Sequence, residues 1–495
     1  MSATPFLSTP AFRPASSAPL EHRPARKVAR NAKAREAGLK GRVVLSTLVC
    51  GVPPAVLLGT GQLTAAGRLF WLLLAAVLVR LVILGRAGEL LCILVATSPL
   101  VALFREFAFY NVVVAVFALG VLFAAYRAPA VTRSVIRGCP LFVALALAMS
   151  LYWCLSFVLT GSYTQNFRMF ELILAVLATL LIQTKPEMPA AALAGLIPAA
   201  CVTGLAMLPH LGSLSAERLG MISIGGFVLG NPISLGAPLA LGLLALVVDG
   251  GHTLRQTIRP FHKAVAILGT VALLGLTSSR AAWLVAAVGL AVSLLLGQGR
   301  RLRLLLSVGI VAVVVSLLLQ IPAGGAFERG LQRTFGGERS ARQRTTGRSD
   351  QWRVAWLAAT ESAGALLYGY GPGHGPDVYA RYSLETPEVQ YGVGERVALH
   401  SLLMQIGVEA GLLGLVPVAL WLGIVLRKVW RHGRNSGLLF PLVCFLGYGV
   451  IVLTVSGNDV FSGLLLGIAL SATVRRPLGH GGSSAAHTGD RRLRG

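Results

Sequence analysis

The apolar run LLMQIGVEAGLLGLVPVALWLGIVL, residues 402–426, contains a single charged side chain, that of Glu409. A hydrocarbon core about 30 Å thick needs roughly 20 apolar residues in one helix, so this run predicts a transmembrane helix. It follows His400 and Ser401 and a polar insert, about residues 322–398, which contains nine arginines and no lysine. Loops longer than about 12–15 residues are usually functional or disordered, so the junction at His400 is a candidate site.

The whole chain has the composition of a membrane protein. Of its 495 residues, 55% are hydrophobic and only 13% are charged, and the mean hydropathy is +0.72. These values predict an all-α polytopic membrane protein with one large loop that contains amphipathic helices. Fourteen segments are candidate spans, and because several are short we expect 12 to 14 helices: 43–60, 68–85, 88–104, 108–126, 139–160, 169–183, 189–208, 227–248, 264–279, 281–297, 304–321, 399–426, 438–456 and 460–474.

The distribution of positive charge predicts the orientation of these spans. With the N-terminus in the cytoplasm, the cytoplasmic segments hold 29 of the 44 lysines and arginines, and the outward segments hold 14. Nine of those 14 lie in the large insert, so the short outward loops are poor in positive charge, as the positive-inside rule requires. The insert is therefore expected outside, with both termini in the cytoplasm. Because the net charge of +25 is spread over helix ends, it does not indicate nucleic-acid binding.

The expected organisation has five parts. A disordered basic tail (1–42) precedes a transmembrane bundle (43–321), the large loop (322–398), the C-terminal transmembrane helices (399–474) and a second tail (475–495). The six cysteines lie in or beside apolar runs without a CxxC pair, which indicates buried thiols and neither a disulfide framework nor a zinc site.

The large loop carries its own structural signals. Residues 347–367 predict an amphipathic helix, with Ser349 as N-cap and Asp350 in the first turn. Trp352 and Trp356 lie one helical turn apart, which suits the membrane interface. The stretch GYGPGHGPD, 369–377, predicts a tight turn that needs glycine.

The candidate functional residues all lie on the predicted outward side. They are Arg218, followed by GNPISLG (230–236), Arg280 at a helix start, Arg348, the GYGPG turn, and His400 with Glu409. A lone arginine at a helix end commonly anchors the helix at the interface, which is how we interpret Arg105 and Arg168. An acid within a span is costly, so Glu409 either pairs with an arginine or positions the site.

The order of these elements resembles the O-antigen ligase and O-antigen polymerase superfamily of bacterial envelope proteins. The resemblance covers roughly residues 215–430, and one departure is Ser401, where many members have asparagine. It is carried by Arg218, Asn231, Pro232, Gly236, Ser279, Arg280, Gly347, Arg348, Trp356, Gly369, Gly371, Gly373, His400, Leu403, Glu409, Gly411, Leu412, Gly414 and Leu415.

The resemblance implies an enzyme of the bacterial inner membrane with its active site on the periplasmic face. Members transfer a glycan from undecaprenyl diphosphate to an acceptor hydroxyl. Arg218, Arg280 and Arg348 would bind the diphosphate, since guanidinium groups match phosphate oxygens. His400 would be the general base, Arg280 would also stabilise the leaving group, and Glu409 would orient His400 or an arginine. We expect inversion at the sugar carbon, no metal and no cofactor.

Several functions stay open at this point. An O-antigen ligase uses lipid A-core as acceptor, a polymerase uses another lipid-linked repeat unit, and a protein-directed transferase uses a hydroxyl side chain. A lipid-linked oligosaccharide transporter is the alternative from another class, although transporters keep ionisable groups near the bilayer midplane. Apart from Glu409, only Arg80, Glu89 and Glu171 could lie at depth here, which favours an enzyme at the boundary over a structural protein or a carrier.

Overall fold

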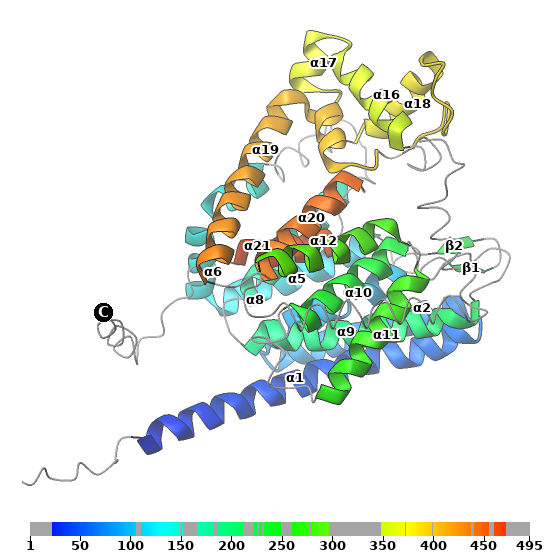
Figure 1. The fold of residues 1–495 in the computed structure, drawn as a ribbon. Helices are drawn as coiled ribbons and strands as arrows, with labels where there is room; N and C mark the ends of the chain where they lie inside the picture. The colour runs from blue at the N-terminus through cyan, green and yellow to red at the C-terminus, as the bar shows by residue number, and fades with distance from the viewer. Residues whose placement is uncertain are drawn as a thin grey trace, which may run out of the picture.

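Helices dominate the chain in the computed structural model (Figure 1). It describes residues 22–104, 110–148, 151, 166–182, 187–210, 222–224, 227–229, 232–248, 260–277, 279–296, 348–371, 373–397, 399–436, 440–454 and 460–471. The N-terminal half contains α1 (His22–Gly59), α2 (Leu63–Ile83), α3 (Ala87–Ala96), α4 (Ser98–Leu103), α5 (Tyr110–Arg127), α6 (Pro129–Gly138), α8 (Asn166–Ile182), α9 (Glu187–Met207), the 3-10 turn Leu208–His210, β1 (Ile222–Ile224), β2 (Phe227–Leu229) and α10 (Pro232–Val247). The rest contains α11 (Pro260–Leu276), α12 (Arg280–Leu296), α16 (Arg348–Thr360), α17 (Ala363–Tyr368), α18 (Gly375–Glu385), α19 (Leu402–Ser436), α20 (Phe440–Thr454) and α21 (Val460–Ser471).

The expected all-α polytopic membrane fold is confirmed. Within the described ranges, three helices are long and apolar enough to cross a membrane, Ala34–Gly59, Leu63–Ile83 and Leu402–Arg431, and several shorter apolar helices accompany them. The exception to the helical pattern is the short antiparallel pair β1–β2, in which Ile222 faces Leu229. The total of 12 to 14 spans stays a prediction, and the expected span 304–321 lies outside the described residues.

Two segments of the structure differ in detail from the sequence prediction. Residues 22–42 were predicted to be disordered, but α1 already begins at His22. Their alanine, lysine, arginine and glutamate residues are good helix formers, and Glu36 pairs with Lys40 one turn later at 2.5 Å. The expected span 88–104 is divided into α3 and α4, with Pro99 in the first turn of α4.

Close helix packing builds the core of the bundle. α1 lies along α9, α8 along α21, α10 beside α11 and α12, and α20 between α12 and α21. At Gly195 of α9, an added Cβ would lie 2.9 Å from the Val43 side chain of α1 and 2.7 Å from Ala96 of α3. Small residues at such crossings let helix backbones approach closely, which is how transmembrane helices gain packing energy without a hydrophobic driving force between them.

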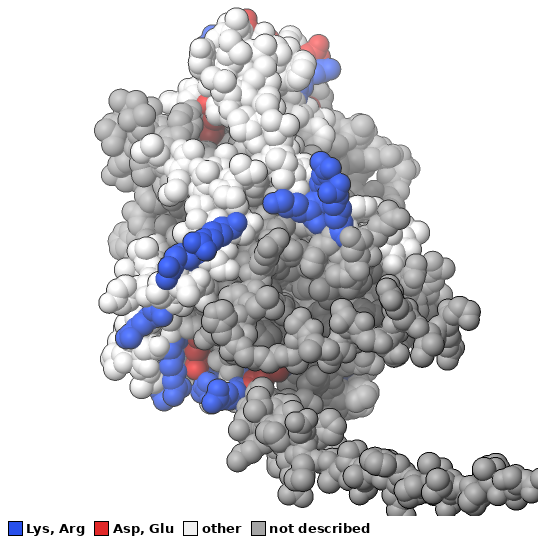
Figure 2. Space-filling view, turned by 90° about the vertical axis from the view of Figure 1, so that its left-hand side faces the viewer, with Lys and Arg blue, Asp and Glu red and all other residues white. Residues whose placement is uncertain are grey.

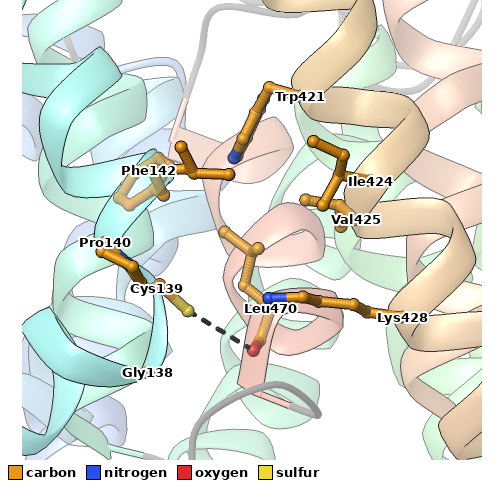
Figure 3. Close-up of a pocket in the computed structure, with 10 residues that line it drawn as sticks. Gly138, Cys139, Pro140, Phe142, Trp421, Ile424, Val425, Lys428 and Leu470 are labelled. Carbon is orange, nitrogen blue, oxygen red and sulfur yellow. Dashed lines mark hydrogen bonds between the residues drawn. The ribbon is translucent and has the colours of Figure 1, made fainter.

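Segments predicted to share one side of the membrane lie together in the fold. Arg42 of α1 donates to the buried Glu89 at 2.9 Å, and Arg86 lies 3.7 Å from the same carboxylate. Gly138 and Lys428 line one small pocket between α6, α19 and α21, where the Cys139 thiol faces the Leu470 carbonyl oxygen at 3.9 Å (Figure 3). Basic side chains form separate groups on the face in Figure 2, with largely uncharged surface between them.

A break in α19 docks the described part of the large loop onto the bundle. Gly411 has φ 58° and ψ −157°, which interrupts the helix and leaves carbonyl oxygens of the preceding turn without their usual helical partners. Residues 369–371, the GYG turn, supply the missing donors. The Tyr370 N–H donates to the Val408 oxygen at 2.8 Å and the Gly371 N–H to the Glu409 oxygen at 2.9 Å. The predicted tight turn is confirmed here, because Gly369, Gly371 and Gly373 all have positive φ.

The backbones of the GYG turn region and of α19 are in contact at two glycines, Gly369 in the turn and Gly411 in α19. A Cβ at Gly411 would lie 2.5 Å from the carbonyl carbon and oxygen of Leu367, and a Cβ at Gly369 would lie 2.5 Å from the carbonyl carbon of Glu409. Backbone atoms cannot move aside as a flexible side chain can. This contact therefore requires glycine at both positions and fixes α16–α18 against the first turns of α19.

Gly411→Ala is expected to destabilise the contact strongly, whereas Gly423→Ala in the same helix is its matched control. Alanine at position 411 would have to adopt a positive φ that favours glycine, and its Cβ would clash with backbone atoms. Together these lower the free energy of unfolding by more than ~2 kcal/mol. Gly423 has helical geometry and open space, so alanine there stabilises by up to about 1 kcal/mol. Thermal unfolding of the purified protein in detergent measures both, and equal melting temperatures for the two variants would contradict the docking role of Gly411.

Candidate functional site

The starts of α12 and α16 bring two arginines together. Arg280 is the first residue of α12, and Arg348 is the first residue of α16. Arg348 is half-buried, and its pKa is lowered by desolvation first and by the positive charge of Arg280 second. Two guanidinium groups close enough to repel each other in a poorly solvated place provide a favourable environment for an anion.

His400 lies at the same corner through its contact with α16. Its backbone N–H donates to Oε1 of Gln351 at 3.3 Å, and the residue precedes the first turn of α19. Gln351 is fully buried and lies one helical turn after Arg348. α16 therefore links His400 to the two arginines. Gln351 was not among the predicted site residues, although its three-residue spacing from Arg348 in an expected helix was the available signal.

Glu409 is buried against the glycine-rich turn. Its carboxylate accepts hydrogen bonds from Nε2 of Gln405 at 3.1 Å and from the backbone N–H groups of Gly373 and Gly375. At Gly375 an added Cβ would lie 3.0 Å from Oε1 of Glu409. Backbone amides that converge on a carboxylate satisfy its charge, so these contacts support a positioning role for Glu409 in holding the turn.

The α16 region differs from its prediction in two respects. The single helix expected over 347–367 is two helices, α16 and α17, and Ser362 caps α17 by accepting from the Ala365 N–H at 3.1 Å. Ser349 is not the N-cap of α16, because the helix already begins at Arg348. Asp350 is in the first turn as predicted, and its buried carboxylate accepts from the N–H groups of Gln390 and Tyr391 at 3.1 and 3.3 Å.

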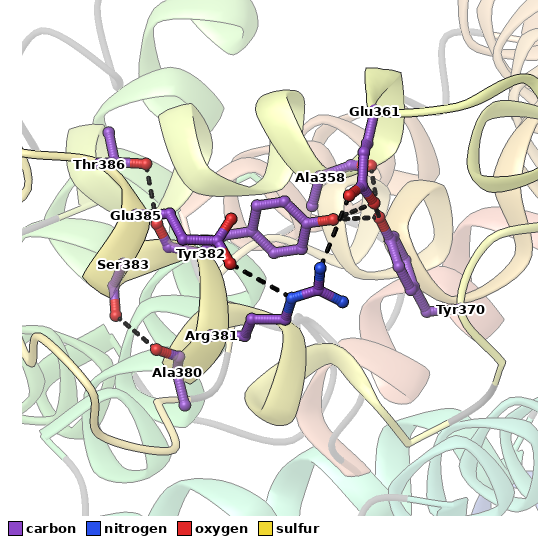
Figure 4. Close-up of polar contacts among 9 residues, drawn as sticks. All are labelled: Ala358, Glu361, Tyr370, Ala380, Arg381, Tyr382, Ser383, Glu385 and Thr386. Atoms are coloured by element: carbon purple, nitrogen blue, oxygen red, sulfur yellow. Dashed lines mark hydrogen bonds and ion pairs between the residues drawn. The ribbon is translucent and has the colours of Figure 1, made fainter.

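A tyrosine–glutamate cluster joins the end of α16 to the GYG turn and α18 (Figure 4). The Glu361 carboxylate accepts hydrogen bonds from the Tyr370 hydroxyl at 2.6 Å and from the Tyr382 hydroxyl. Arg381 lies 3.7 Å from Glu361 and 5.1 Å from the centre of the Tyr382 ring. The cluster ties the Tyr370 side chain of the GYG turn to α16 and α18.

Glycine and serine position the start of α12. A Cβ at Gly236 of α10 would lie 2.8 Å from the Ala282 side chain, so glycine permits α10 to approach the first turn of α12. Ser279 is buried, and its Oγ accepts from the Ala282 N–H at 3.5 Å. These two predicted motif residues therefore support the helix end that carries Arg280.

Other predicted residues have different outcomes. Trp352 and Trp356 are 40% and 66% exposed, so both are available to the membrane interface, which stays a prediction. Arg218, Asn231 and Gly347 lie outside the described residues. No group of three or more His, Cys, Asp or Glu side chains that could hold a metal ion is found in the part of the chain that the structure covers.

Glu409→Gln is expected to loosen the glycine turn. The new amide places N–H atoms against the N–H donors that now face the carboxylate, and an unsatisfied buried group costs about 1–3 kcal/mol. Glu385→Gln is the control, because Glu385 is 54% exposed and paired with Arg381 on the surface. Thermal unfolding compares the two, and a Glu409→Gln protein as stable as the control would rule out this role.

Acid is expected to weaken the cluster around Glu361. Its pKa is lowered from 4.5, first by the hydrogen bond from Tyr370 and then by that from Tyr382. A lowered folded pKa means that the stabilisation is present above the unfolded pKa and is lost as pH falls through the folded pKa. Near-UV circular dichroism of the tyrosines should therefore change below about pH 4.5 in the wild type. Glu361→Gln should lack that transition, whereas Glu388→Gln, at an exposed pair with Arg353, should keep it.

A comparison with protein families matches part of the chain. The profile of the O-antigen ligase family matches residues 264–419, a range that contains Arg280, Arg348, His400 and Glu409 and leaves out Arg218. No curated protein matches the chain. The match over residues 264–419, in a chain with membrane-spanning helices, supports the O-antigen ligase superfamily and, in general terms, glycan transfer of the ligase or polymerase type.

Proposed function

We propose that this protein transfers a glycan from undecaprenyl diphosphate to an acceptor hydroxyl, as an O-antigen ligase with lipid A-core as acceptor. The reaction would take place on the periplasmic face of the bacterial inner membrane, where the positive-inside pattern puts the large loop. The observation that carries the proposal is the proximity of Arg280 and Arg348 beside the residue that anchors His400.

The paired arginines suit a diphosphate. A lipid-linked diphosphate brings at least two negative charges to the membrane boundary, and guanidinium groups bind phosphate oxygens through two parallel hydrogen bonds. Binding such an anion removes the repulsion between Arg280 and Arg348. Arg218, which precedes α10 in sequence, is proposed as a third ligand. The arginines supply the charge that a divalent metal supplies in many nucleotide-sugar transferases, so we propose a metal-independent reaction.

The bond changes follow from these positions. The acceptor hydroxyl oxygen forms a bond to the first carbon of the sugar, and the bond from that carbon to the phosphate oxygen breaks. The diphosphate leaves with the electron pair of that bond, and Arg280 and Arg348 stabilise the charge that develops on it. Attack from the side opposite the phosphate inverts the configuration of the carbon.

His400 is proposed to take the proton of the acceptor hydroxyl. Imidazole is the side chain best suited to accept a proton near neutral pH. Gln351 holds the backbone of His400, and His400 is half-buried. Its side chain therefore extends from a backbone position that is fixed relative to α16. Glu409 acts at one remove, by holding the glycine turn that supports α19.

Complementation of a gene deletion in the native host tests the proposal. We expect His400→Ala to lower transfer by about 10²–10⁴-fold and Arg280→Ala and Arg348→Ala by about 10²–10³-fold. Arg353→Ala is the matched control, because Arg353 also lies on α16 but is 53% exposed and paired with Glu388. Surface polysaccharide and lipid-linked intermediates would be resolved on gels, with expression of each variant verified.

The intermediates distinguish the two transferase types. Long lipid-linked chains that accumulate without surface glycan indicate a ligase, and single lipid-linked repeat units indicate a polymerase. Normal surface glycan with both His400→Ala and Arg280→Ala would exclude the proposed chemistry and favour a transporter of lipid-linked oligosaccharides.

A further inference from the structure

Two buried hydrogen-bond donors without partners lie on one face of α16. Among the described residues, Nε of Arg348 and Nε2 of Gln351 are buried and have no hydrogen-bond partner. The two residues are three positions apart in one helix, so their side chains are neighbours on the same face. A buried donor without a partner loses its hydration and gains nothing in return, and native proteins contain few such groups.

The oxygen of the Gln351 side-chain amide holds this side chain at the site. Oε1 accepts the N–H of His400 at 3.3 Å, and the side chain is 0% exposed. Because the amide is planar and rigid, Nε2 stays beside the oxygen that His400 holds. Gln405 offers a contrast within the same region, since it is also buried but donates its Nε2 to Glu409 at 3.1 Å.

An acceptor-only anionic group satisfies all the free donors at once. A phosphate oxygen accepts hydrogen bonds and carries the charge that Arg348 and Arg280 require, whereas a sugar hydroxyl would satisfy Gln351 and leave the repulsion between the arginines in place. We propose that Gln351 is a substrate-binding residue whose Nε2 donates to a phosphate oxygen of the lipid-linked diphosphate, next to Arg348. The inference rests on the proposed function, since it assigns a further ligand at the same site.

The Gln351 side chain thereby has two roles, one for each end of its amide. Oε1 fixes the backbone of His400, and Nε2 binds the leaving group of the same reaction. One planar amide then holds the backbone of the base and the leaving group near each other. Near-attack geometry of this kind is what positioning contributes to a transfer reaction.

The test measures binding of farnesyl diphosphate and of farnesol to the full-length protein in nanodiscs. Gln351→Met keeps the volume and removes the donor without adding charge, so we expect roughly tenfold or greater weakening for farnesyl diphosphate and no change for farnesol. His400→Ala is the control, because it should leave binding of the diphosphate within about twofold of wild type. Loss of affinity in Gln351→Met then cannot arise through a lost contact of the His400 side chain with the diphosphate.

A second variant separates the two ends of the amide. Gln351→Glu keeps an oxygen for the His400 N–H, removes the donor and adds a negative charge, so it should also bind farnesyl diphosphate weakly and raise the KM for the lipid-linked donor more than it lowers kcat. It serves as the deciding variant if Gln351→Met does not fold, with Gln351→Asp as its charge-matched, shorter counterpart that cannot reach His400.

The outcomes distinguish the inference from the function on which it rests. If Gln351→Met binds farnesyl diphosphate as wild type does while Arg348→Ala does not, Gln351 is not a ligand and the proposed function stands. If wild-type protein binds farnesyl diphosphate no better than farnesol, the diphosphate site itself is wrong and both proposals fall.

Discussion

The site depends on a contact between two backbones, that of the GYG turn and that of α19 where Gly411 interrupts the helix. A helix that crosses a membrane normally satisfies its own carbonyl groups, and here Val408 and Glu409 offer theirs to the turn at 2.8 and 2.9 Å. The contact fixes the register between α16–α18 and α19. Arg348 belongs to one side of this junction and His400 to the other, so these main-chain hydrogen bonds, together with the bond from the His400 N–H to the Gln351 side chain, set their separation.

Charge is concentrated where it is hardest to solvate. Arg348 is half-buried near Arg280, and its free Nε lies on the same face as the free amide nitrogen of Gln351. Such an arrangement costs stability in the unliganded protein, and proteins keep unfavourable electrostatics mainly where function requires them. Glu409 differs, because Gln405 and two backbone amides satisfy its carboxylate and it contributes to the architecture of the turn.

Sequence reasoning predicted the fold class, the glycine turn and the group of Arg280, Arg348 and His400, because hydropathy and motif order report on these directly. It failed where the answer depended on tertiary contacts. Residues 347–367 have the period of one helix, and the break at Ser362 appears only because the Glu361 cluster and the docking of α17 on α19 require a bend. The sequence marks Gln351 only by its three-residue spacing from Arg348, and a glutamine becomes informative once its burial and its partner are known.

The use of main-chain atoms at the junction has a consequence for how such a protein can evolve. Only Gly369 and Gly411 are constrained by the contact itself, while the exposed side chains of α16–α18, among them Trp356, Tyr368 and Leu384, take no part in it. Mutations on that outer surface can accumulate without moving the arginines or the histidine. The surface can thus diversify under selection while the arrangement of Arg280, Arg348 and His400 stays the same.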